Sequence, residues 1–400
     1  MTTPSEADLI QVANNLLHPH GLQVGSCKVL QSLWAGYGVT ARINATPCPA
    51  PQGGLARTLI LKYISPPSGR EHDEGHFRKV ISYQVERHFY EHLAEELPGE
   101  IAIAECLGSC AVGGEGVALL LEDLGESFRV AGEKRGVLNA TQVRAAVRWL
   151  GEFHGFWWGR VANEGTREEM RRPPLEEAKM AGERDGVWLN GGYTYLATRR
   201  KEYDSLRGDS SSEWSERLCL PLPQAQGRSI TELVAQVLAP SPKPSSQSRI
   251  AKYETLIHGD VKSENLFTTL SGHEVAFFDF QYVGLGLGVC DLAKLFTCSV
   301  PISMLCTASD PMPHALDLDA GERELLHAYR KAIDPKGKMY PSQELERHWQ
   351  TALVDWLRFQ ASWGFWGNTA WLEARVRFIL QDEGWRRWVL DAAVGEEACG

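Results

Sequence analysis

His258-Gly259-Asp260-Val261-Lys262-Ser263-Glu264-Asn265, followed after a short interval by Asp279-Phe280-Gln281, decides the fold of this 400-residue chain. The first stretch comes directly after the apolar Leu256-Ile257, and the second comes directly after Val275-Ala276-Phe277-Phe278. Short apolar runs of this kind are typical of buried β-strands. We therefore expect two short strands, each of which delivers a carboxylate to the same end of one small sheet.

Three side chains in these stretches suit phosphoryl transfer. That reaction needs a carboxylate that orients and deprotonates the attacking hydroxyl, and oxygen ligands that hold Mg²⁺ against the phosphates of ATP. Asp260 suits the first role, and Asn265 and Asp279 suit the second. An aspartate near a glycine is by itself more often part of a turn, so the prediction depends on the three residues together.

The pattern HGDxxxxN followed by DFQ resembles the catalytic and metal-binding motifs of aminoglycoside phosphotransferases, choline and ethanolamine kinases, and ecdysteroid-kinase-like proteins. The resemblance implies a protein-kinase-like fold that uses ATP and Mg²⁺. It implies that Asp260 is the catalytic base and that Asn265 and Asp279 are the Mg²⁺ ligands. It also implies that His258 supports the loop and that Asp291 braces it.

Lys262 lies two residues after the expected base, where protein kinases carry a lysine that touches the transferred phosphate. A second catalytic residue is therefore one interpretation of Lys262. An ordinary solvated lysine is the other, and the sequence leaves both open.

The first lobe carries the expected nucleotide contacts. Lys62 lies inside the strand-like run 58–64, and a buried lysine is costly unless an anion meets it. Lys62 therefore fits the lysine that contacts the α and β phosphates, with Glu86 on the following helix as its ion-pair partner. Glu91 and Glu95 on the same helix are alternative partners, and an edge-strand lysine that points to solvent is the alternative for Lys62 itself.

Two further groups of residues complete the expected ATP site. Gly36 and Gly38 allow the backbone to close over the phosphates, although Ala41 stands where the third glycine of a kinase loop would fall. Backbone groups near Glu122 and Leu124 resemble the hinge that pairs with adenine. An acidic helix start is the alternative interpretation of the hinge carboxylates.

The predicted fold is α+β and bilobal, with an antiparallel sheet and one main helix in residues 1–122 and a larger, mostly helical lobe in residues 123–400. The expected strands of the first lobe are two strands around a turn within 27–46, followed by 58–64, 101–107 and 117–121. The expected main helix carries Phe77, Ile81, Val85, Phe89 and Leu93 on one face.

Helices dominate the expected second lobe. One helix has Val143, Val147, Leu150 and His154 on one face and Thr141 as its cap. Breaker-rich residues 205–250 predict a mobile loop that includes a short helix near 229–238. The last hundred residues are predicted to be helical.

Two features count against a protein kinase. The motif lacks the arginine that reads a phosphorylated activation loop, and eleven residues separate Asp279 from Asp291, too few for a peptide-binding activation segment. The expected acceptor is therefore a small molecule with a hydroxyl group. Trp356, Trp363 and Trp366 are candidates for its pocket, because aromatic faces hold cationic amines. The alternative is that tryptophans at helical spacing form core.

The composition indicates which partners are unfavoured and in which compartment the protein is expected. A formal net charge of −10 argues against a nucleic-acid partner, and no apolar run is long enough to predict a membrane span. The acidic run from Asp310 to Glu324 either attracts a cation or is a solvated surface. Nine cysteines without paired spacing and a polar N-terminus predict reduced thiols in a cytoplasmic protein.

The leading hypothesis is transfer of the γ-phosphate of ATP to a hydroxyl of an amino alcohol, an aminoglycoside-like or a sterol-like acceptor. A nucleotide-binding pseudokinase that acts as a scaffold is the alternative, and a metal-dependent phosphohydrolase is a third hypothesis. The identity of the acceptor and the oligomeric state are left open by the sequence.

Overall fold

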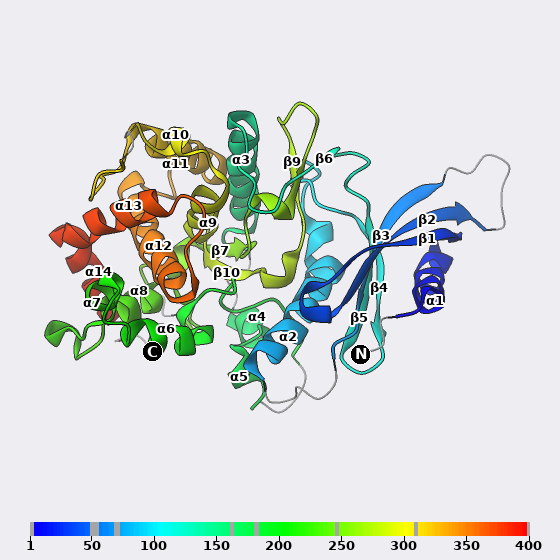
Figure 1. Ribbon diagram of the computed structural model, residues 1–400, viewed down its shortest axis with the longest axis horizontal. Coiled ribbons are helices and arrows are strands. Elements are labelled where there is room, and N and C mark those ends of the chain that lie inside the picture. Colours follow the sequence, from blue (N-terminus) through cyan, green and yellow to red (C-terminus); the bar gives the residue numbers. More distant parts are fainter. Residues whose placement is uncertain are drawn as a thin grey trace.

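Five antiparallel strands in the order β1-β2-β3-β5-β4 form the sheet of the first lobe in the computed structural model (Figure 1). The structure describes residues 4–48, 56–67, 73–160, 164–179, 184–244, 248–307 and 311–397. The strands are β1 Leu22–Ser32, β2 Gly38–Pro47, β3 Arg57–Ile64, β4 Cys106–Val112 and β5 Gly116–Glu122.

Two helices cover the two faces of this sheet. α1 (Glu6–Leu17), which the sequence analysis did not predict, packs with Leu59 and Leu61 in a small separate core. α2 (Glu74–His88) packs on the other face and continues into a π-helical turn at Phe89–Leu93. Because neighbouring residues of a strand face opposite sides, Leu61 faces α1 and Lys62 faces α2.

The strand expected at 101–107 lies five residues further along the chain. β4 begins at Cys106, and a turn through Gly113 and Gly114, both with positive φ, joins it to β5. The turn fixes the register of the hairpin, with Ala111 opposite Val117. Residues 101–105 are therefore left outside the sheet, and the prediction for them was wrong.

The second lobe is mostly helical (Figure 1). The fold as a whole is α+β and bilobal, as predicted. The helices of the second lobe are α3 Ala140–Trp157, α4 Glu164–Glu169, α5 Pro174–Glu177, α6 Arg200–Arg207, α7 Glu213–Cys219, α8 Ile230–Leu238, α9 Val289–Ser299, α10 Ile302–Leu305, α11 Ala320–Ile333, α12 Ser342–Trp363, α13 Thr369–Gln381 and α14 Glu383–Glu397. In the part of the chain that the structure describes, no helix combines the length and apolar character that a bilayer span requires.

The second lobe also contains two small sheets. β7 (Glu254–Ile257) pairs with β10 (Gly284–Leu287), whereas β9 (Val275–Phe277) pairs with β8 (Leu266–Thr268), which also pairs with β6 (Val130–Ala131). The expectation that the strands before Asp260 and Asp279 share one sheet was therefore wrong. A side chain joins them instead, since Nε2 of His258 lies 2.9 Å from the carbonyl oxygen of Phe278.

The region expected to be a mobile loop with one short helix holds a further helix and buried side chains. α7 and α8 lie within residues 205–250, and Trp214 and Leu218 are buried. Ser212, which lies within the range predicted to be a loop, caps α7 by accepting the Trp214 N–H. The helix expected near 229–238 is confirmed as α8, while residues 245–247 lie outside the described residues.

The cap of α3 is Asn139 and not Thr141. The Asn139 side chain accepts the N–H groups of Thr141 and Gln142, and the Gln142 side chain accepts the N–H of Asn139. This reciprocal arrangement is a capping box. Thr141 therefore lies inside the first turn of the helix.

One member of the acidic run is neither a solvated surface residue nor free to attract a cation. Glu322 on α11 is buried and pairs with Arg375 on α13 at 2.9 Å. Its other carboxylate oxygen accepts the Trp349 indole N–H at 2.6 Å. Asp310 lies outside the described residues.

The eight cysteines in the described ranges are free thiols, and Cys399 lies outside those ranges.

Candidate active site

Asp291, in the first turn of α9, holds the segment that carries Asp260. Its two carboxylate oxygens accept the backbone N–H groups of His258 at 2.7 Å and Gly259 at 3.0 Å, and His154 lies 3.2 Å away. Burial works to raise the pKa of Asp291, but the hydrogen bond and charge of His154 lower it below the usual range. The carboxylate therefore stays ionised and can brace the loop.

Gly259 allows the chain to turn tightly at this point. Its φ is 85°, and an added Cβ would lie 2.3 Å from the carbonyl oxygen of Tyr282. No other residue type fits this position without a shift of the backbone. The ammonium of Lys294, one turn after Asp291 on α9, donates to the Gly259 carbonyl at 2.5 Å.

His258 supports the loop as a neutral side chain. It is fully buried, its Nε2 donates to the Phe278 carbonyl, and its Nδ1 accepts the Asp260 N–H at 3.3 Å. This pattern of one donor and one acceptor fits the neutral imidazole. Burial lowers the pKa of His258, which agrees with that state.

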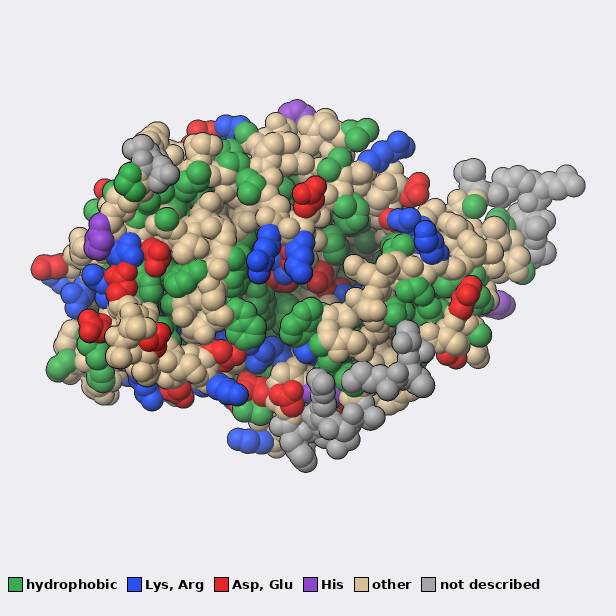
Figure 2. Space-filling view, in the orientation of Figure 1, with side chains coloured by type: hydrophobic (Ala, Val, Ile, Leu, Met, Phe, Trp, Pro, Cys, Tyr) green, Lys and Arg blue, Asp and Glu red, His purple; other side chains and the backbone are tan. Residues whose placement is uncertain are grey.

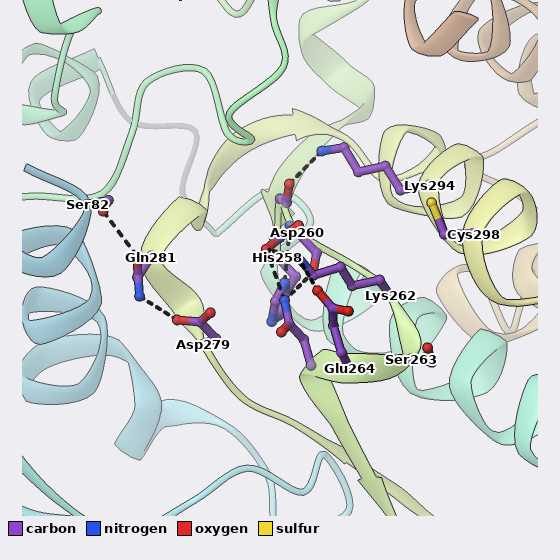
Figure 3. A network of polar contacts seen from close by, with 12 residues as sticks. Ser82, His258, Asp260, Lys262, Ser263, Glu264, Asp279, Gln281, Lys294 and Cys298 are labelled. Carbon is purple, nitrogen blue, oxygen red and sulfur yellow. Dashed lines mark hydrogen bonds and ion pairs between the residues drawn. The ribbon is translucent and has the colours of Figure 1, made fainter. Parts of the chain in front are cut away.

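Asp260 lies at the centre of a group of polar side chains (Figure 3). Its Oδ2 accepts Nδ2 of Asn265 at 3.0 Å and lies 3.1 Å from Nζ of Lys262. The same Lys262 ammonium lies 3.0 Å from Oε1 of Glu264. Burial opposes the charge on Lys262, but the two carboxylates hold its pKa above the usual value. Lys262 is therefore ion-paired at the site and is not an ordinary solvated lysine.

Lys62 makes one ion pair within the first lobe and one to the second lobe. Its ammonium lies 2.6 Å from Glu86 on α2 and 2.9 Å from Asp279, which follows β9 in the second lobe. Lys62 is 7% exposed, so it is not a solvent-facing edge lysine. Burial opposes its charge, but Asp279 and Glu86 hold the pKa of Lys62 well above its usual value.

Glu86, and neither alternative on the same helix, is the partner of Lys62. Glu91 pairs with Arg87 at 2.8 Å and faces Ser109 on β4. Glu95 lies beyond the π-helical turn, in the short 3₁₀ segment Ala94–Glu96. The π turn at Phe89–Leu93 changes the direction of the side chains that follow it.

Asp279 adopts a left-handed backbone conformation with φ 67°, which is uncommon for a residue with a side chain. Its Oδ1 accepts the amide of Gln281 at 2.6 Å as well as the Lys62 ammonium. Burial works to raise the pKa of Asp279, but Lys62 lowers it, so the carboxylate is ionised. Gln281 also accepts the hydroxyl of Ser82 on α2, which ties this loop to the first lobe.

The donor set of Asn265 and Asp279 fits a magnesium ion. Mg²⁺ prefers oxygen ligands, and Asp279 offers an ionised carboxylate. The amide nitrogen of Asn265 donates to Asp260, and its amide oxygen accepts no hydrogen bond from any residue within the described ranges. That oxygen is therefore available as a ligand.

The glycines and the hinge lie at the ends of strands of the first lobe. Gly36, with φ 75°, lies in the turn before β2. Gly38 lies so close to β3 that an added Cβ would be 2.0 Å from the Tyr63 carbonyl oxygen, so the sheet alone requires glycine there. Glu122 ends β5 and its N–H donates to the Glu105 carbonyl; Leu124 is buried in the turn that follows. Their contacts with a nucleotide stay predictions.

A cavity of about 420 Å³ opens in front of Asp260. Its aromatic lining comes from Trp34, Tyr193, Trp356, Trp363, Phe365 and Trp366, and its charged lining comes from Lys134, Arg135, Asp260, Lys262, Glu264 and Lys294. In the space-filling view, basic side chains gather over the hollowed middle of this face, with hydrophobic ones below them (Figure 2). Because Trp34 takes part, the turn that carries Gly36 lies next to the same cavity.

The tryptophans of the last hundred residues divide between cavity and core. Trp356, Trp363 and Trp366 line the cavity, and Trp363 is 55% exposed. Trp349 and Trp371 are fully buried between helices. Trp356 is only 3% exposed and belongs to the core as well as to the cavity wall. That an acceptor binds against Trp356, Trp363 and Trp366 stays a prediction.

Four residues that line the cavity were not among those predicted from the sequence: Lys294, Tyr193, Lys134 and Arg135. Lys294 lies three residues after Asp291, so its helical spacing was a usable signal. The other three come from irregular segments whose position depends on long-range packing, and no local pattern marks them.

The sequence profile of the ecdysteroid kinase-like family matches residues 42–312, more than half of the chain. The chain belongs to the ecdysteroid kinase-like family. This family match begins within β2 and covers β3 and α2, the segment from His258 to Asn265, and Asp279. No curated protein matches the sequence.

Several solved structures resemble this family member over most of its length. Ethanolamine kinase from Plasmodium vivax shares 12% identity, with 97% of this chain and 87% of that chain covered and a TM-score of 0.45. Choline kinase from Cryptosporidium parvum Iowa II shares 13% identity over 93% and 89%, with a TM-score of 0.42. A macrolide 2'-phosphotransferase type I shares 13% over 100% and 99%, with a TM-score of 0.41.

Proposed function

We propose that this protein transfers the γ-phosphate of ATP to a hydroxyl group of a small molecule. The observation that carries the proposal is the position of Asp260, which contacts Asn265 and Lys262 and also lines an aromatic cavity large enough for a small molecule. Membership of a kinase-like family supports it. Residues 1–122 would hold the nucleotide, and residues 123–400 would supply the reacting groups and the acceptor cavity.

Each polar residue of the site has a role in this reaction. The acceptor hydroxyl lies in the cavity with its proton directed at Asp260, which takes the proton as the new oxygen–phosphorus bond forms and the bond to the β-phosphate oxygen breaks. Lys62, held by Glu86, binds the α and β phosphates, and Lys262 lies where it can hold the transferred group. Asn265 and Asp279 would hold Mg²⁺, which neutralises phosphate charge when bound.

The charges of the cavity favour an uncharged or anionic acceptor over an amine. Lys134, Arg135, Lys262 and Lys294 line it, against the two carboxylates of Asp260 and Glu264, and Lys262 already pairs with both of these. A cationic amino alcohol or aminoglycoside would meet a net positive lining. Among the acceptor classes that the sequence suggested, the aromatic walls therefore favour an apolar, sterol-like alcohol.

The test is a product assay with Mg-ATP against a panel of sterols, sugars and amino alcohols. Asp260→Asn should lower kcat by about 10² to 10⁴, because it removes the proton acceptor, while ADP binding stays unchanged. Asp209→Asn, on an exposed turn, is the matched control. Absence of product together with absence of any ATP hydrolysis that Asp260→Asn abolishes would contradict the proposal. Mg-ATP binding without turnover would support the nucleotide-binding scaffold instead.

A further inference from the structure

Two histidines of the first lobe and an aspartate of the second lobe meet at the surface, and none of them lines the cavity in front of Asp260. His88 is the last residue of α2, and His92 lies in the π-helical turn that follows. Asp185 comes three residues before Trp188, which forms a β-bridge with Gly284 of β10. Nδ1 of His88 lies 3.0 Å from Oδ1 of Asp185, and Nε2 of His92 lies 3.9 Å from Oδ2 of Asp185. The centres of the two rings are 4.6 Å apart.

These separations are close to those of ligands that share one ion. All three side chains offer a ligand atom within 4.8 Å of the others. Ligand atoms about 2.1 Å from a Zn²⁺ ion lie roughly 3.0 to 3.4 Å apart in octahedral or tetrahedral geometry, so only small rotations of the exposed His92 and Asp185 are needed. Imidazole and carboxylate together suit Zn²⁺ and neighbouring divalent transition metals, and not Mg²⁺.

We propose that His88, His92 and Asp185 bind a divalent transition-metal ion of the Zn²⁺ type, with water in the remaining positions. The side chains of His92 and Asp185 are 53% and 71% exposed, so an ion has access from solvent. The nearby Glu91 is engaged with Arg87 and is not needed as a ligand.

The position of this site connects it with the nucleotide half of the molecule. His88 lies two residues after Glu86 on α2, so an ion here holds the end of the helix that positions Lys62. On the other side, Trp188 lies three residues after Asp185, and its indole N–H donates to the Gln281 carbonyl at 2.9 Å. The ion therefore links α2 to the segment that packs behind Asp279.

The experiment is calorimetric titration of the tag-free chain with Zn²⁺ in excess Mg²⁺ and without nucleotide. Wild type should bind one Zn²⁺ ion saturably, and His92→Ala and Asp185→Ala should each weaken that binding at least about tenfold, as losses at metal sites do. His273→Ala, which removes an exposed histidine elsewhere, should bind Zn²⁺ like wild type. Melting temperatures without metal should be the same in all four proteins.

A second measurement separates this site from the free cysteines and the Mg²⁺ ligands. Zn²⁺ should slow amide hydrogen exchange at the C-terminal end of α2 in wild type, and should have no such effect in His92→Ala. Unchanged Zn²⁺ binding in both site variants, or no saturable binding in wild type, would overturn the proposal. Slowed exchange in His92→Ala as well would also overturn it.

Discussion

Lys62 divides its charge between two carboxylates, and this makes the role of Glu86 testable. In Glu86→Gln the ammonium keeps only Asp279 as a charged partner, so it should hold Asp279 more strongly against Mg²⁺. We expect a higher Mg²⁺ concentration for half-maximal ATP turnover, by about tenfold or more, which corresponds to about 1.4 kcal/mol. Turnover measured across a Mg²⁺ series at fixed ATP checks this.

Glu91→Gln is the matched control for that experiment. Glu91 lies on the same stretch of chain but pairs with Arg87, so its replacement should leave the Mg²⁺ dependence unchanged. An equal shift in both variants would mean that the effect comes from the helix and not from the Lys62 pair.

His348 predicts how stability depends on pH. It is buried on α12 with its Nδ1 2.7 Å from the Tyr340 hydroxyl, and burial, helped by the charge of Lys252, lowers its pKa from 6.5 to about 3. Between these values the unfolded chain binds the proton and the folded chain does not. As far as His348 is concerned, the free energy of unfolding is therefore highest above pH 6.5. It falls by up to about 1.4 kcal/mol per pH unit as the pH drops towards 3.

His348→Gln should make that dependence shallower. Chemical unfolding between pH 7 and 4.5 measures the slope, and His273→Gln, at an exposed position, should keep the slope of wild type. If His348→Gln, like His273→Gln, gave the wild-type slope, His348 would not be the source of the pH dependence.

At the scale of single elements, the cap of α3 gives a paired test. Asn139→Ala removes the acceptor of two backbone N–H groups and should lower the free energy of unfolding by about 0.5 to 2 kcal/mol. Thr141→Ala leaves the capping box intact and should change it by less than about 0.5 kcal/mol. Urea denaturation of both variants checks the difference, and a larger loss in Thr141→Ala would show that the cap is assigned to the wrong residue.

Some helices and strands could be predicted from the sequence, and others could not. The strand around Lys62 and the helix of Glu86 follow from local patterns, since apolar residues alternate or recur there at fixed spacing. β4 was misplaced because its limits depend on the turn at Gly113-Gly114 and on pairing with β5, and not on its own composition. Residues 205–250 were misjudged because serine and aspartate serve as helix caps as readily as loop residues.

The candidate site shows a similar division. Asp260, Asn265 and Asp279 could be named because they lie in one short segment with a recognisable spacing. The bond between Lys62 and Asp279 joins residues that are 217 positions apart, and no local pattern reports such a contact. Lys134 and Arg135 reach the cavity because β6 pairs with β8, which directly follows the segment from His258 to Asn265.

At the scale of the whole molecule, a buried ion pair holds the helices of the second lobe together. Arg375 on α13 and Glu322 on α11 are almost fully buried, and Trp349 on α12 donates to the same carboxylate. Arg375→Met leaves this carboxylate buried without its counter-ion and should cost about 3 to 5 kcal/mol. The double variant with Glu322→Gln should recover part of that loss, because no uncompensated charge remains.

The exposed pair of Arg144 and Glu324 is the control for this prediction. Both side chains are more than half exposed, so Arg144→Met should cost less than about 1 kcal/mol. Thermal and urea unfolding of the three variants checks the order. Equal losses in Arg144→Met and Arg375→Met would contradict the role given to the buried pair.

The bond from Lys62 to Asp279 has a further consequence for how ligands enter. In the proposed reaction Mg²⁺ would compete with Lys62 for Asp279, and the phosphates would compete with Asp279 for Lys62. The arrival of either ligand therefore releases the group that binds the other, so the two should bind cooperatively. By thermodynamic reciprocity, the factor by which Mg²⁺ raises the affinity for nucleotide equals the factor by which nucleotide raises the affinity for Mg²⁺. Under the proposed function, a single lysine would thus make the protein selective for the complex of ion and nucleotide over either component alone.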